Sequence, residues 1–413
     1  MTAAVPQTRT LPLWWPQAAL AAVVAGSLAL RLFRLDLPGI PVFDEGLFYI
    51  PAARAYLAGL PDPNFEHPPL GKELFAAGIA LAGDNLVGWR IMSAIFGSAG
   101  VALTAWLGGM LWGSLRAGLA AAAILATDVL WLLFSRLMMY DIFLATLVLL
   151  ALCLGWRYRQ TGSLPVLAAA GLAVGLAGAV KWSGFWALAP LGLAIAFAPG
   201  ASRRAGAMAG RMTLVGLGAL AGYGLPWFYH VVVLGYGPGD LLAQHLRMLG
   251  YQVQIGAPPD RLEQLLTPLR WLLDQPLVFT ARDDRSVWVV ALANPLLFWG
   301  GIVATVVMTW RAAHRRPRWT ALASPGTFLV TWVLVFYLPW FLFPRVKYFY
   351  YLMPLLPALA LAVTGLLRNV PASTGGRFAH WQRLGTAAYG CGLAAVLAGL
   401  YPALIGLWSA PHE

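Results

Sequence analysis

Long apolar runs separated by short polar connections dominate the sequence. Several runs reach the roughly 20 residues that a helix needs to cross a hydrocarbon core about 30 Å thick. Alternation of polar and apolar positions, which would indicate strands, does not appear. The pattern predicts an all-α polytopic membrane protein with about eleven spans. We expect them at residues 16–34, 89–111, 115–134, 137–157, 165–181, 183–199, 211–232, 286–309, 325–343, 347–367 and 385–408.

The composition agrees with a membrane protein. Of the 413 residues, 60% are hydrophobic and only 11% are charged, whereas soluble domains are about 25% charged. No convincing cleavage site follows the first apolar run, which we therefore expect to be a retained helix. Cys153 and Cys391 both lie inside apolar runs and are expected to be buried thiols.

The distribution of charge predicts the topology. The net charge is +12, but Arg and Lys are scattered between spans and form no basic stripe, which argues against nucleic-acid binding. One set of connections, including the N-terminus, carries arginines and no Asp or Glu. By the positive-inside rule this set is cytoplasmic. Almost all acidic residues lie in the opposite set, so we expect the chemistry at the extracytoplasmic face of the plasma or inner membrane.

The chain is expected to be one transmembrane domain, residues 1–413, with two long external loops at 35–88 and 233–285. Within them, Glu45–Leu60 and Leu241–Leu249 each predict a helix with one apolar face. Such helices usually lie in the membrane interface. Simple shielding of the bundle is the alternative role.

The most unusual polar segment is Asp44-Glu45, followed in the same loop by Glu66-His67-Pro68-Pro69. The adjacent carboxylates can serve as favourable charges at a helix start. Alternatively, Asp44 is a catalytic base and Glu45 orients an acceptor or a cation. Glu66, His67 and, from the second loop, His245 are weak candidates for a divalent-metal site, since no His or Cys pair has metal-ligand spacing.

Cationic side chains recur at the same external level. Arg136 is followed by Asp141 across a short turn, Lys181 precedes Trp182, and Arg345 begins a basic aromatic segment. Arginines at span ends often only reach toward the interface. Together, however, these positions favour a site for the phosphate of an anionic lipid.

These motifs, in this order, resemble those of the protein O-mannosyltransferases that use a polyprenyl-phosphate sugar donor. The resemblance extends over about residues 30–370. The matching pieces are Asp44-Glu45, His67-Pro68-Pro69-Leu70-Gly71-Lys72, Ser135-Arg136 with Asp141, Lys181-Trp182-Ser183-Gly184, Asn294-Pro295-Leu296-Leu297-Phe298-Trp299, and Arg345 through Pro354.

The resemblance implies a GT-C type membrane glycosyltransferase that inverts configuration at the sugar. It would transfer mannose, or a similar hexose, to Ser or Thr hydroxyls of exported proteins. Asp44 would be the base with help from Glu45, and Arg136, Arg345 and Lys181 would bind the donor phosphate. Glu66, His67, Asp141, Tyr350 and Tyr351 would support the loop or the acceptor. No cofactor is required, although a divalent metal is compatible with this chemistry.

Two departures from the family pattern affect these expectations. The second external loop has only about fifty residues, which indicates a compact prokaryotic type without the large inserted domain. Tyr350-Tyr351 stand where the family usually has histidine. A related enzyme that glycosylates a lipid or glycan, like the aminoarabinose transferases, is the alternative. A transporter or flippase is disfavoured, because Asp128 is the only acidic residue well inside a span.

Overall fold

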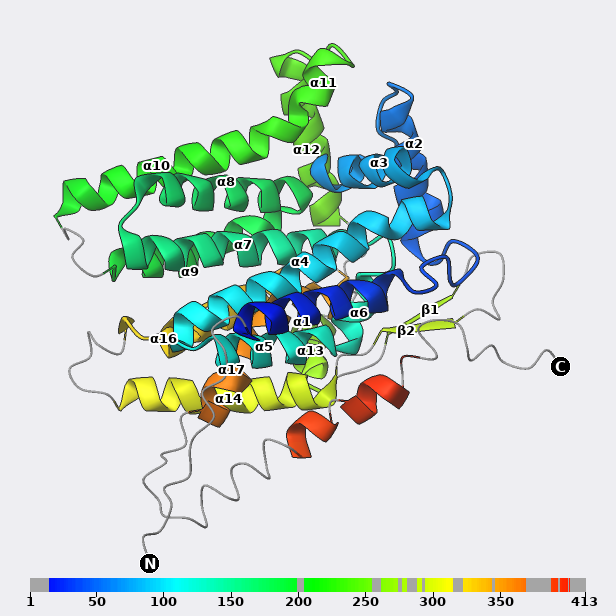
Figure 1. Ribbon diagram of the computed structural model, residues 1–413. Helices are drawn as coiled ribbons and strands as arrows, with labels where there is room; N and C mark the ends of the chain where they lie inside the picture. The colour runs from blue at the N-terminus through cyan, green and yellow to red at the C-terminus, as the bar shows by residue number, and fades with distance from the viewer. Residues whose placement is uncertain are drawn as a thin grey trace, which may run out of the picture.

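The computed structural model describes residues 15–198, 204–254, 261–273, 277–280, 288–291, 294–314, 322–343, 346–368, 388–392, 394–399 and 401. Most long helices run side by side (Figure 1). They are α1 (Trp15–Leu32), α4 (Leu86–Trp112), α5 (Leu115–Ala126), α6 (Val129–Phe134), α7 (Tyr140–Thr161), α8 (Leu164–Val180), α9 (Leu188–Ala196), α10 (Ala205–Gly224), α14 (Pro295–Ala313), α16 (Pro325–Tyr337) and α17 (Leu356–Arg368). The predicted all-α class is confirmed.

The two long connecting segments carry elements of their own, several of which gather at one end of the bundle (Figure 1). The first contains a π-helix η1 (Glu45–Tyr49), α2 (Ile50–Leu57) and α3 (Leu70–Ala82). The second, after α11 (Phe228–Val232), contains α12 (Pro238–Gln254), α13 (Arg261–Trp271), β1 (Leu277–Thr280) and β2 (Trp288–Ala291). The strands pair antiparallel, with Leu277 opposite Ala291. Helices therefore form where Glu45–Leu60 and Leu241–Leu249 predicted them.

The predicted span 286–309 starts too early. Residues 288–291 form β2, and the helix begins only at Pro295. The side chain of Asn294 caps it by accepting a hydrogen bond from the Leu296 backbone N–H at 3.1 Å, and proline is well suited to a first helical turn.

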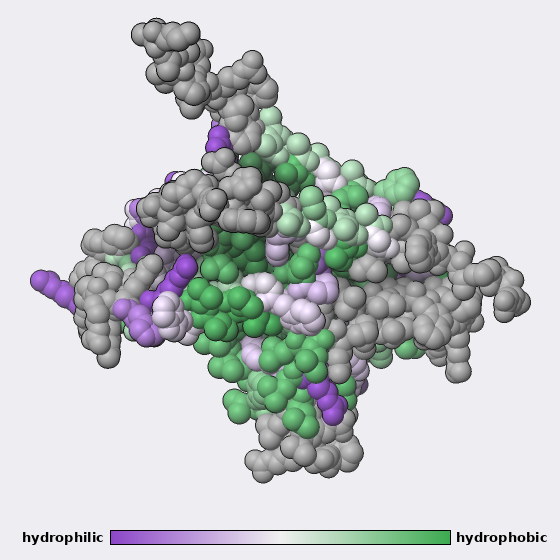
Figure 2. Space-filling model, turned by 90° about the horizontal axis from the view of Figure 1, so that it is seen from below, coloured by the Kyte–Doolittle hydropathy of each residue, from purple (hydrophilic) through white to green (hydrophobic). Residues whose placement is uncertain are grey.

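Four helices are long and apolar enough to cross a membrane: Leu86–Trp112, Tyr140–Thr161, Pro295–Ala313 and the continuous helix Phe349–Arg368. Shorter apolar helices accompany them, so the chain is a multi-pass membrane protein. Figure 2 shows the molecule from below, where hydrophobic residues predominate over the coloured part of the surface. The count of eleven spans stays a prediction.

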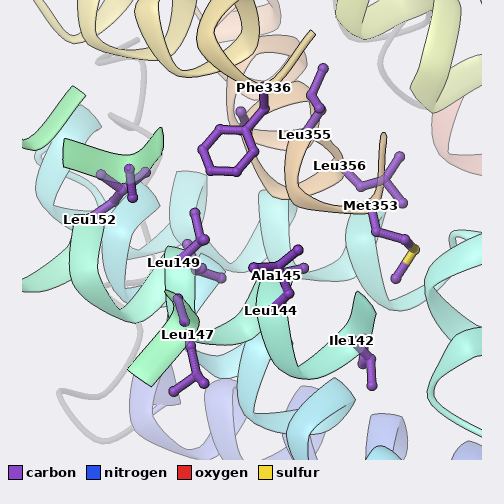
Figure 3. Close-up of a cluster of buried hydrophobic side chains, with 14 of the residues drawn as sticks. Ile142, Leu144, Ala145, Leu147, Leu149, Leu152, Phe336, Met353, Leu355 and Leu356 are labelled. Carbon is purple, nitrogen blue, oxygen red and sulfur yellow. The ribbon is translucent and has the colours of Figure 1, made fainter. Parts of the chain in front are cut away.

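Helix α7 forms the centre of the core. Its residues from Tyr140 to Leu149 are all buried, as expected of a helix that is apolar on all sides. Leu144, Leu149 and Leu152 belong to one buried hydrophobic cluster with Phe336 of α16 and Leu356 of α17 (Figure 3). Because α7 begins with Tyr140-Asp141, this rigid core fixes one acidic residue at the end of the bundle that carries the connecting segments.

Glycines bring α8 and α10 into close backbone contact. A Cβ atom at Gly175 would lie 2.1 Å from the Ala219 carbonyl oxygen, and one at Gly222 would lie 2.2 Å from that of Leu172. Small residues at helix interfaces permit this approach in membrane proteins. The contact places Tyr223, near the end of α10, beside Trp182, which follows α8.

Asp128 joins two distant parts of the chain. Its carboxylate caps α6 by accepting a hydrogen bond from Trp131 N–H at 2.8 Å, and it also accepts one from Asn294 N–H at 2.9 Å. A buried carboxylate between two backbone donors has a structural role, which agrees with the argument against a transporter.

Candidate active site

A cavity of about 240 Å³ opens where the connecting segments meet the core. Its polar side is formed by Glu66, His67, Asp141, Lys181 and Gln252. Its other walls are mainly apolar and aromatic: Leu144, Trp182, Trp186, Leu249, Val253, Trp340, Phe343 and Tyr351. Five residues predicted for the site, namely Glu66, His67, Asp141, Lys181 and Tyr351, thus line one cavity although they are far apart in the sequence.

A strained turn precedes the predicted base. Phe43 has a φ angle of +50°, a left-handed conformation that is unusual for a bulky residue. The rare π-helix η1 begins two residues later. Both features concentrate at functional sites in proteins. Here they direct the neighbouring side chains of Asp44 and Glu45 into different surroundings.

Asp44 is half-buried and accepts a hydrogen bond from the Tyr49 hydroxyl at 3.2 Å. Burial raises the pKa of its carboxyl group to about 6. The Tyr49 hydrogen bond and the charge of Lys181 oppose this rise in pKa, whereas the charges of Glu66 and Asp141 add to it. A carboxylate with a pKa near the working pH is well matched to accept a proton from a hydroxyl group.

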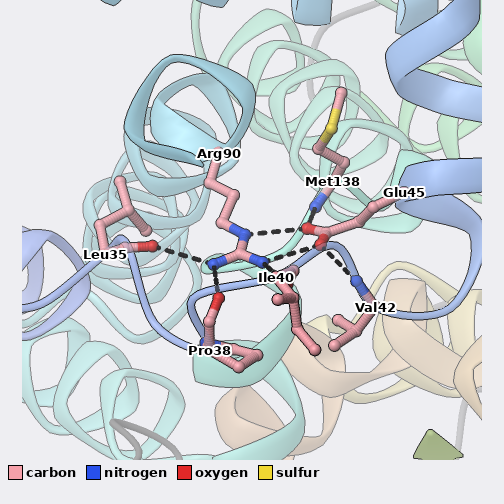
Figure 4. A network of polar contacts seen from close by, with 7 residues as sticks. All are labelled: Leu35, Pro38, Ile40, Val42, Glu45, Arg90 and Met138. Carbon is pink, nitrogen blue, oxygen red and sulfur yellow. Dashed lines mark hydrogen bonds and ion pairs between the residues drawn. The ribbon is translucent and has the colours of Figure 1, made fainter. Parts of the chain in front are cut away.

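Glu45 is buried in a separate network (Figure 4). Its carboxylate pairs with both Arg90 Nε at 3.0 Å and Nη2 at 2.8 Å, and it also accepts hydrogen bonds from the backbone N–H groups of Val42 and Met138. All of its oxygens are therefore engaged. The geometry does not support the predicted direct contact of Glu45 with acceptor or cation, and points to a role in holding the turn.

Arg90 was not singled out from the sequence. Besides Glu45, its guanidinium donates to the carbonyl oxygens of Leu35, Pro38 and Ile40 at 3.1–3.2 Å (Figure 4). These bonds fix the segment that leads into Asp44. The available signal was a lone arginine near the start of an apolar run, because a cation at such a position is expected to be paired.

A buried lysine organises the loop that contains Glu66 and His67. Lys72 forms an ion pair with Asp62 and donates to the carbonyl oxygens of Asn64 at 2.6 Å and His67 at 2.7 Å. The His67 ring packs edge-on against Tyr140, with centroids 5.4 Å apart. Within the described residues, the Glu66 carboxylate has no hydrogen-bond or ion-pair partner and faces the cavity.

Lys181 and Asp141 form an ion pair in the cavity wall. The ammonium group lies 2.7 and 2.9 Å from the two carboxylate oxygens. It also lies 5.7 Å from the ring centre of Tyr350 and 5.5 Å from that of Tyr351, distances at which an aromatic face attracts a cation. Tyr350 is buried behind the wall, whereas Tyr351 lines the cavity. Lys181 is thus oriented and partly neutralised.

Arg136 does not face the cavity. Its guanidinium donates to the carbonyl oxygens of Leu30, Arg31, Phe33 and Arg34 at 2.7–3.1 Å. These carbonyls belong to the last turn of α1 and the residues after it, where a helix has unpaired acceptors. The predicted phosphate contact of Arg136 is corrected accordingly: its side chain caps α1. Arg345, the other predicted phosphate ligand, lies outside the described residues.

The alternative of a metal site gains no support. No group of three or more His, Cys, Asp or Glu side chains that suits a metal ion occurs in the described part of the chain. Both ring nitrogens of His245 are engaged, one with the Tyr223 hydroxyl at 2.9 Å and one with the Leu241 carbonyl oxygen at 2.7 Å. His245 therefore does not join Glu66 and His67 as a ligand.

Helix α12 closes one side of the cavity. Gln252 donates to the Glu66 carbonyl oxygen at 2.8 Å, and Tyr251 packs edge-on against Phe65. The Arg247 guanidinium lies 3.7 Å from the centre of the Phe65 ring. The second connecting segment thus holds the loop of the first, which the sequence alone did not reveal.

Comparison with known proteins agrees with this geometry. Residues 83–199, which include Arg90, Asp141 and Lys181, match the family model of dolichyl-phosphate-mannose-protein mannosyltransferases. A polyprenol-phosphate-mannose–protein mannosyltransferase of Mycobacterium tuberculosis is 26% identical, over 92% of this chain and 85% of that protein. The corresponding enzyme of Mycolicibacterium smegmatis is 30% identical over 41% of this chain and 39% of its own.

Solved structures show the same fold. The Saccharomyces cerevisiae protein O-mannosyltransferase Pmt1–Pmt2 complex bound to the sugar donor matches with a TM-score of 0.76 at 12% identity, over 96% of this chain and 91% of that chain. ArnT of Cupriavidus metallidurans bound to undecaprenyl phosphate matches with a TM-score of 0.63 at 17% identity, over 94% of this chain and 76% of that chain. The predicted resemblance is thus confirmed: part of the chain matches the mannosyltransferase family model, and its fold is similar to those of the Pmt1–Pmt2 complex and ArnT.

Proposed function

We propose that this protein is an inverting glycosyltransferase that moves mannose from a polyprenyl-phosphate carrier to Ser or Thr hydroxyls of exported proteins. The names of its relatives support the mannose donor and the class of reaction. The cavity supports a lipid-phosphate substrate, because one side is polar with a cation and the other is apolar and aromatic. The observation that carries the proposal is the half-buried Asp44 carboxylate, whose pKa is raised to about 6 and which interacts electrostatically with Lys181, Glu66 and Asp141 of the cavity wall.

The reaction is a single displacement. The acceptor hydroxyl oxygen bonds to the anomeric carbon of mannose, and the bond from that carbon to the phosphate oxygen breaks. The phosphate departs with the bonding electron pair. Asp44 takes the hydroxyl proton, and Lys181, held by Asp141, stabilises the charge that grows on the phosphate. Arg345 remains a predicted second phosphate ligand.

The remaining residues would position the reacting groups. Glu45 and Arg90 hold the turn that presents Asp44, while Glu66 and His67 form the acceptor side of the cavity. Tyr351, with Tyr350 behind it, orients Lys181. We further propose that residues 1–413 act as one transmembrane domain with a cytoplasmic N-terminus and an extracytoplasmic cavity, as the arginine distribution favours.

A donor panel tests the proposal. Purified protein in lipid nanodiscs is incubated with polyprenyl phosphate carrying mannose, glucose or aminoarabinose, together with a Ser/Thr peptide or an amphipathic glycolipid acceptor. We expect mannosylated peptide only from the mannose donor. Transfer of any sugar to the glycolipid but not to the peptide would overturn the acceptor assignment. No consumption of any donor would overturn the enzyme assignment.

A further inference from the structure

A relay of hydrogen bonds connects the cavity wall to α12. The indole N–H of Trp182 donates to the Tyr223 hydroxyl oxygen at 3.0 Å, and that oxygen lies 2.9 Å from His245 Nε2. His245 Nδ1 lies 2.7 Å from the Leu241 carbonyl oxygen. The relay thus crosses from the segment after α8, through α10, to α12.

For a neutral His245 ring, the chemistry of the end groups assigns the donor and the acceptor of each hydrogen bond in the relay. A carbonyl oxygen only accepts, so His245 Nδ1 carries the hydrogen and Nε2 is the acceptor in the neutral ring. The Tyr223 hydroxyl therefore donates to His245, and its oxygen accepts from Trp182, whose indole only donates. The His245 ring is in turn held against the Trp227 indole, with centroids 4.5 Å apart and an interplanar angle of 30°.

Trp182 is the residue of this relay that lines the cavity. It lines the cavity directly after Lys181 and beside Ser183. An indole ring presents a flat apolar surface on which the C–H face of a pyranose packs. In the proposed function the donor sugar occupies the same cavity as Lys181, which binds its phosphate. Neither Tyr223 nor His245 lines this cavity, and the hydrogen bond that connects them to its wall is the one from Trp182.

We propose that Tyr223 and His245 are positioning residues that fix the Trp182 indole as the platform for the donor sugar. This inference rests on the proposed function. It predicts recognition of a pyranose attached to the lipid phosphate, rather than recognition of the lipid phosphate alone. It also explains why α12, which contacts the acceptor-side loop through Gln252, is anchored to the donor-side wall through His245.

The test compares Tyr223→Phe with a matched control, Tyr229→Phe. The first removes the hydroxyl that holds Trp182 and retains the ring. The second removes a hydroxyl that donates to the Leu60 carbonyl oxygen at 2.9 Å, away from the cavity lining. For loss of one hydrogen bond we expect Tyr223→Phe to raise the KM for polyprenyl-phosphate-mannose about fivefold, with kcat changed less than twofold. Inhibition by sugar-free polyprenyl phosphate should be unchanged, and Tyr229→Phe should behave as wild type.

A double-mutant cycle separates positioning from a general structural effect. In a Trp182→Phe background, Tyr223→Phe should have no further effect on KM, because the group that it positions is gone. An undiminished effect in that background, or an unchanged KM in Tyr223→Phe alone, would overturn the inference while leaving the proposed function intact. Failure of the wild-type protein to consume the mannose donor would instead overturn the proposed function.

Discussion

Asp44 and Glu45 are adjacent in the chain but belong to two very different regions. Around Glu45, each oxygen of the carboxylate and every nitrogen of Arg90 has a partner, and both side chains are buried. Asp44 does not itself line the cavity, but its carboxylate interacts electrostatically with Glu66, Asp141 and Lys181, which do. The Glu66 carboxylate has no hydrogen-bond or ion-pair partner within the described residues. Fully paired buried charges hold the backbone, whereas the incompletely paired ones are available to a substrate. The following changes test this distinction.

Replacing the base should have the largest effect. Asp44→Asn removes the proton acceptor but no phosphate contact, so we expect transfer to fall about 10³-fold. Donor binding, measured by competition with a labelled polyprenyl phosphate, should be retained. Asp36→Asn, an exposed position in the same segment, is the matched control and should retain full activity. Substantial transfer by Asp44→Asn would assign the base elsewhere.

Disrupting the paired region should affect stability first. Arg90→Lys keeps the charge but cannot reproduce a planar fork that reaches Glu45 and three carbonyl oxygens. Leaving a buried carboxylate incompletely paired should lower the free energy of unfolding by about 3 kcal/mol. Thermal unfolding in detergent measures this loss. An unchanged melting temperature together with lost activity would show that Arg90 acts in the chemistry instead.

A substitution at Arg136 distinguishes a role in capping α1 from a role in binding the donor phosphate. Arg136→Ala leaves several carbonyl oxygens at the end of α1 without a donor, so we expect a loss of about 2 kcal/mol in stability. The exposed pair of Arg54 with Asp84 provides the control, since removing it should cost about 0–1 kcal/mol. The KM for donor in the folded fraction should equal that of wild type. A raised KM without destabilisation would restore the phosphate role.

Lys181 should show the smallest of these effects, because Asp141 already shares its charge. Lys181→Met should raise the KM for donor about tenfold, as expected for one charged hydrogen bond. The loss of affinity should be smaller for a sugar analogue that lacks phosphate. Inhibition of transfer by that analogue measures its affinity. Equal effects on ligands with and without phosphate would contradict the assigned contact.

The sequence predicted elements and cavity better than individual partners. Apolar runs identified the membrane helices, because a span must be apolar over a fixed length. The motifs at Asp44 and Glu66 lie in the loop between two of those runs, and Lys181 stands at the end of another. The packing of α7 and α8 brings Asp141 and Lys181 together. The order of the motifs and their position at one face of the membrane were sufficient to predict residues of the cavity.

Pairings between distant residues could not be predicted from the sequence. Nothing in the neighbouring sequence shows that the Arg136 side chain caps α1, which lies over one hundred positions earlier. Nor does it show that Glu45 pairs with Arg90. An arginine at a span end looks the same whether it binds phosphate or caps a helix. The relay from Trp182 to His245 was hidden for the same reason, because it depends on the glycine contact between α8 and α10.

The pH dependence of kcat/KM tests the central claim about Asp44 most directly. A base must be deprotonated, so with a pKa raised to about 6 activity should be full at pH 8 and should fall about tenfold per unit well below pH 6. The phosphodiester of the donor does not titrate there, and His67→Gln should keep the same midpoint, which excludes His67 as the titrating group. Glu66→Gln should move the midpoint to lower pH, because Glu66 raises the pKa of Asp44. A midpoint near pH 4, or one lost in His67→Gln, would contradict the assignment of Asp44 as the base.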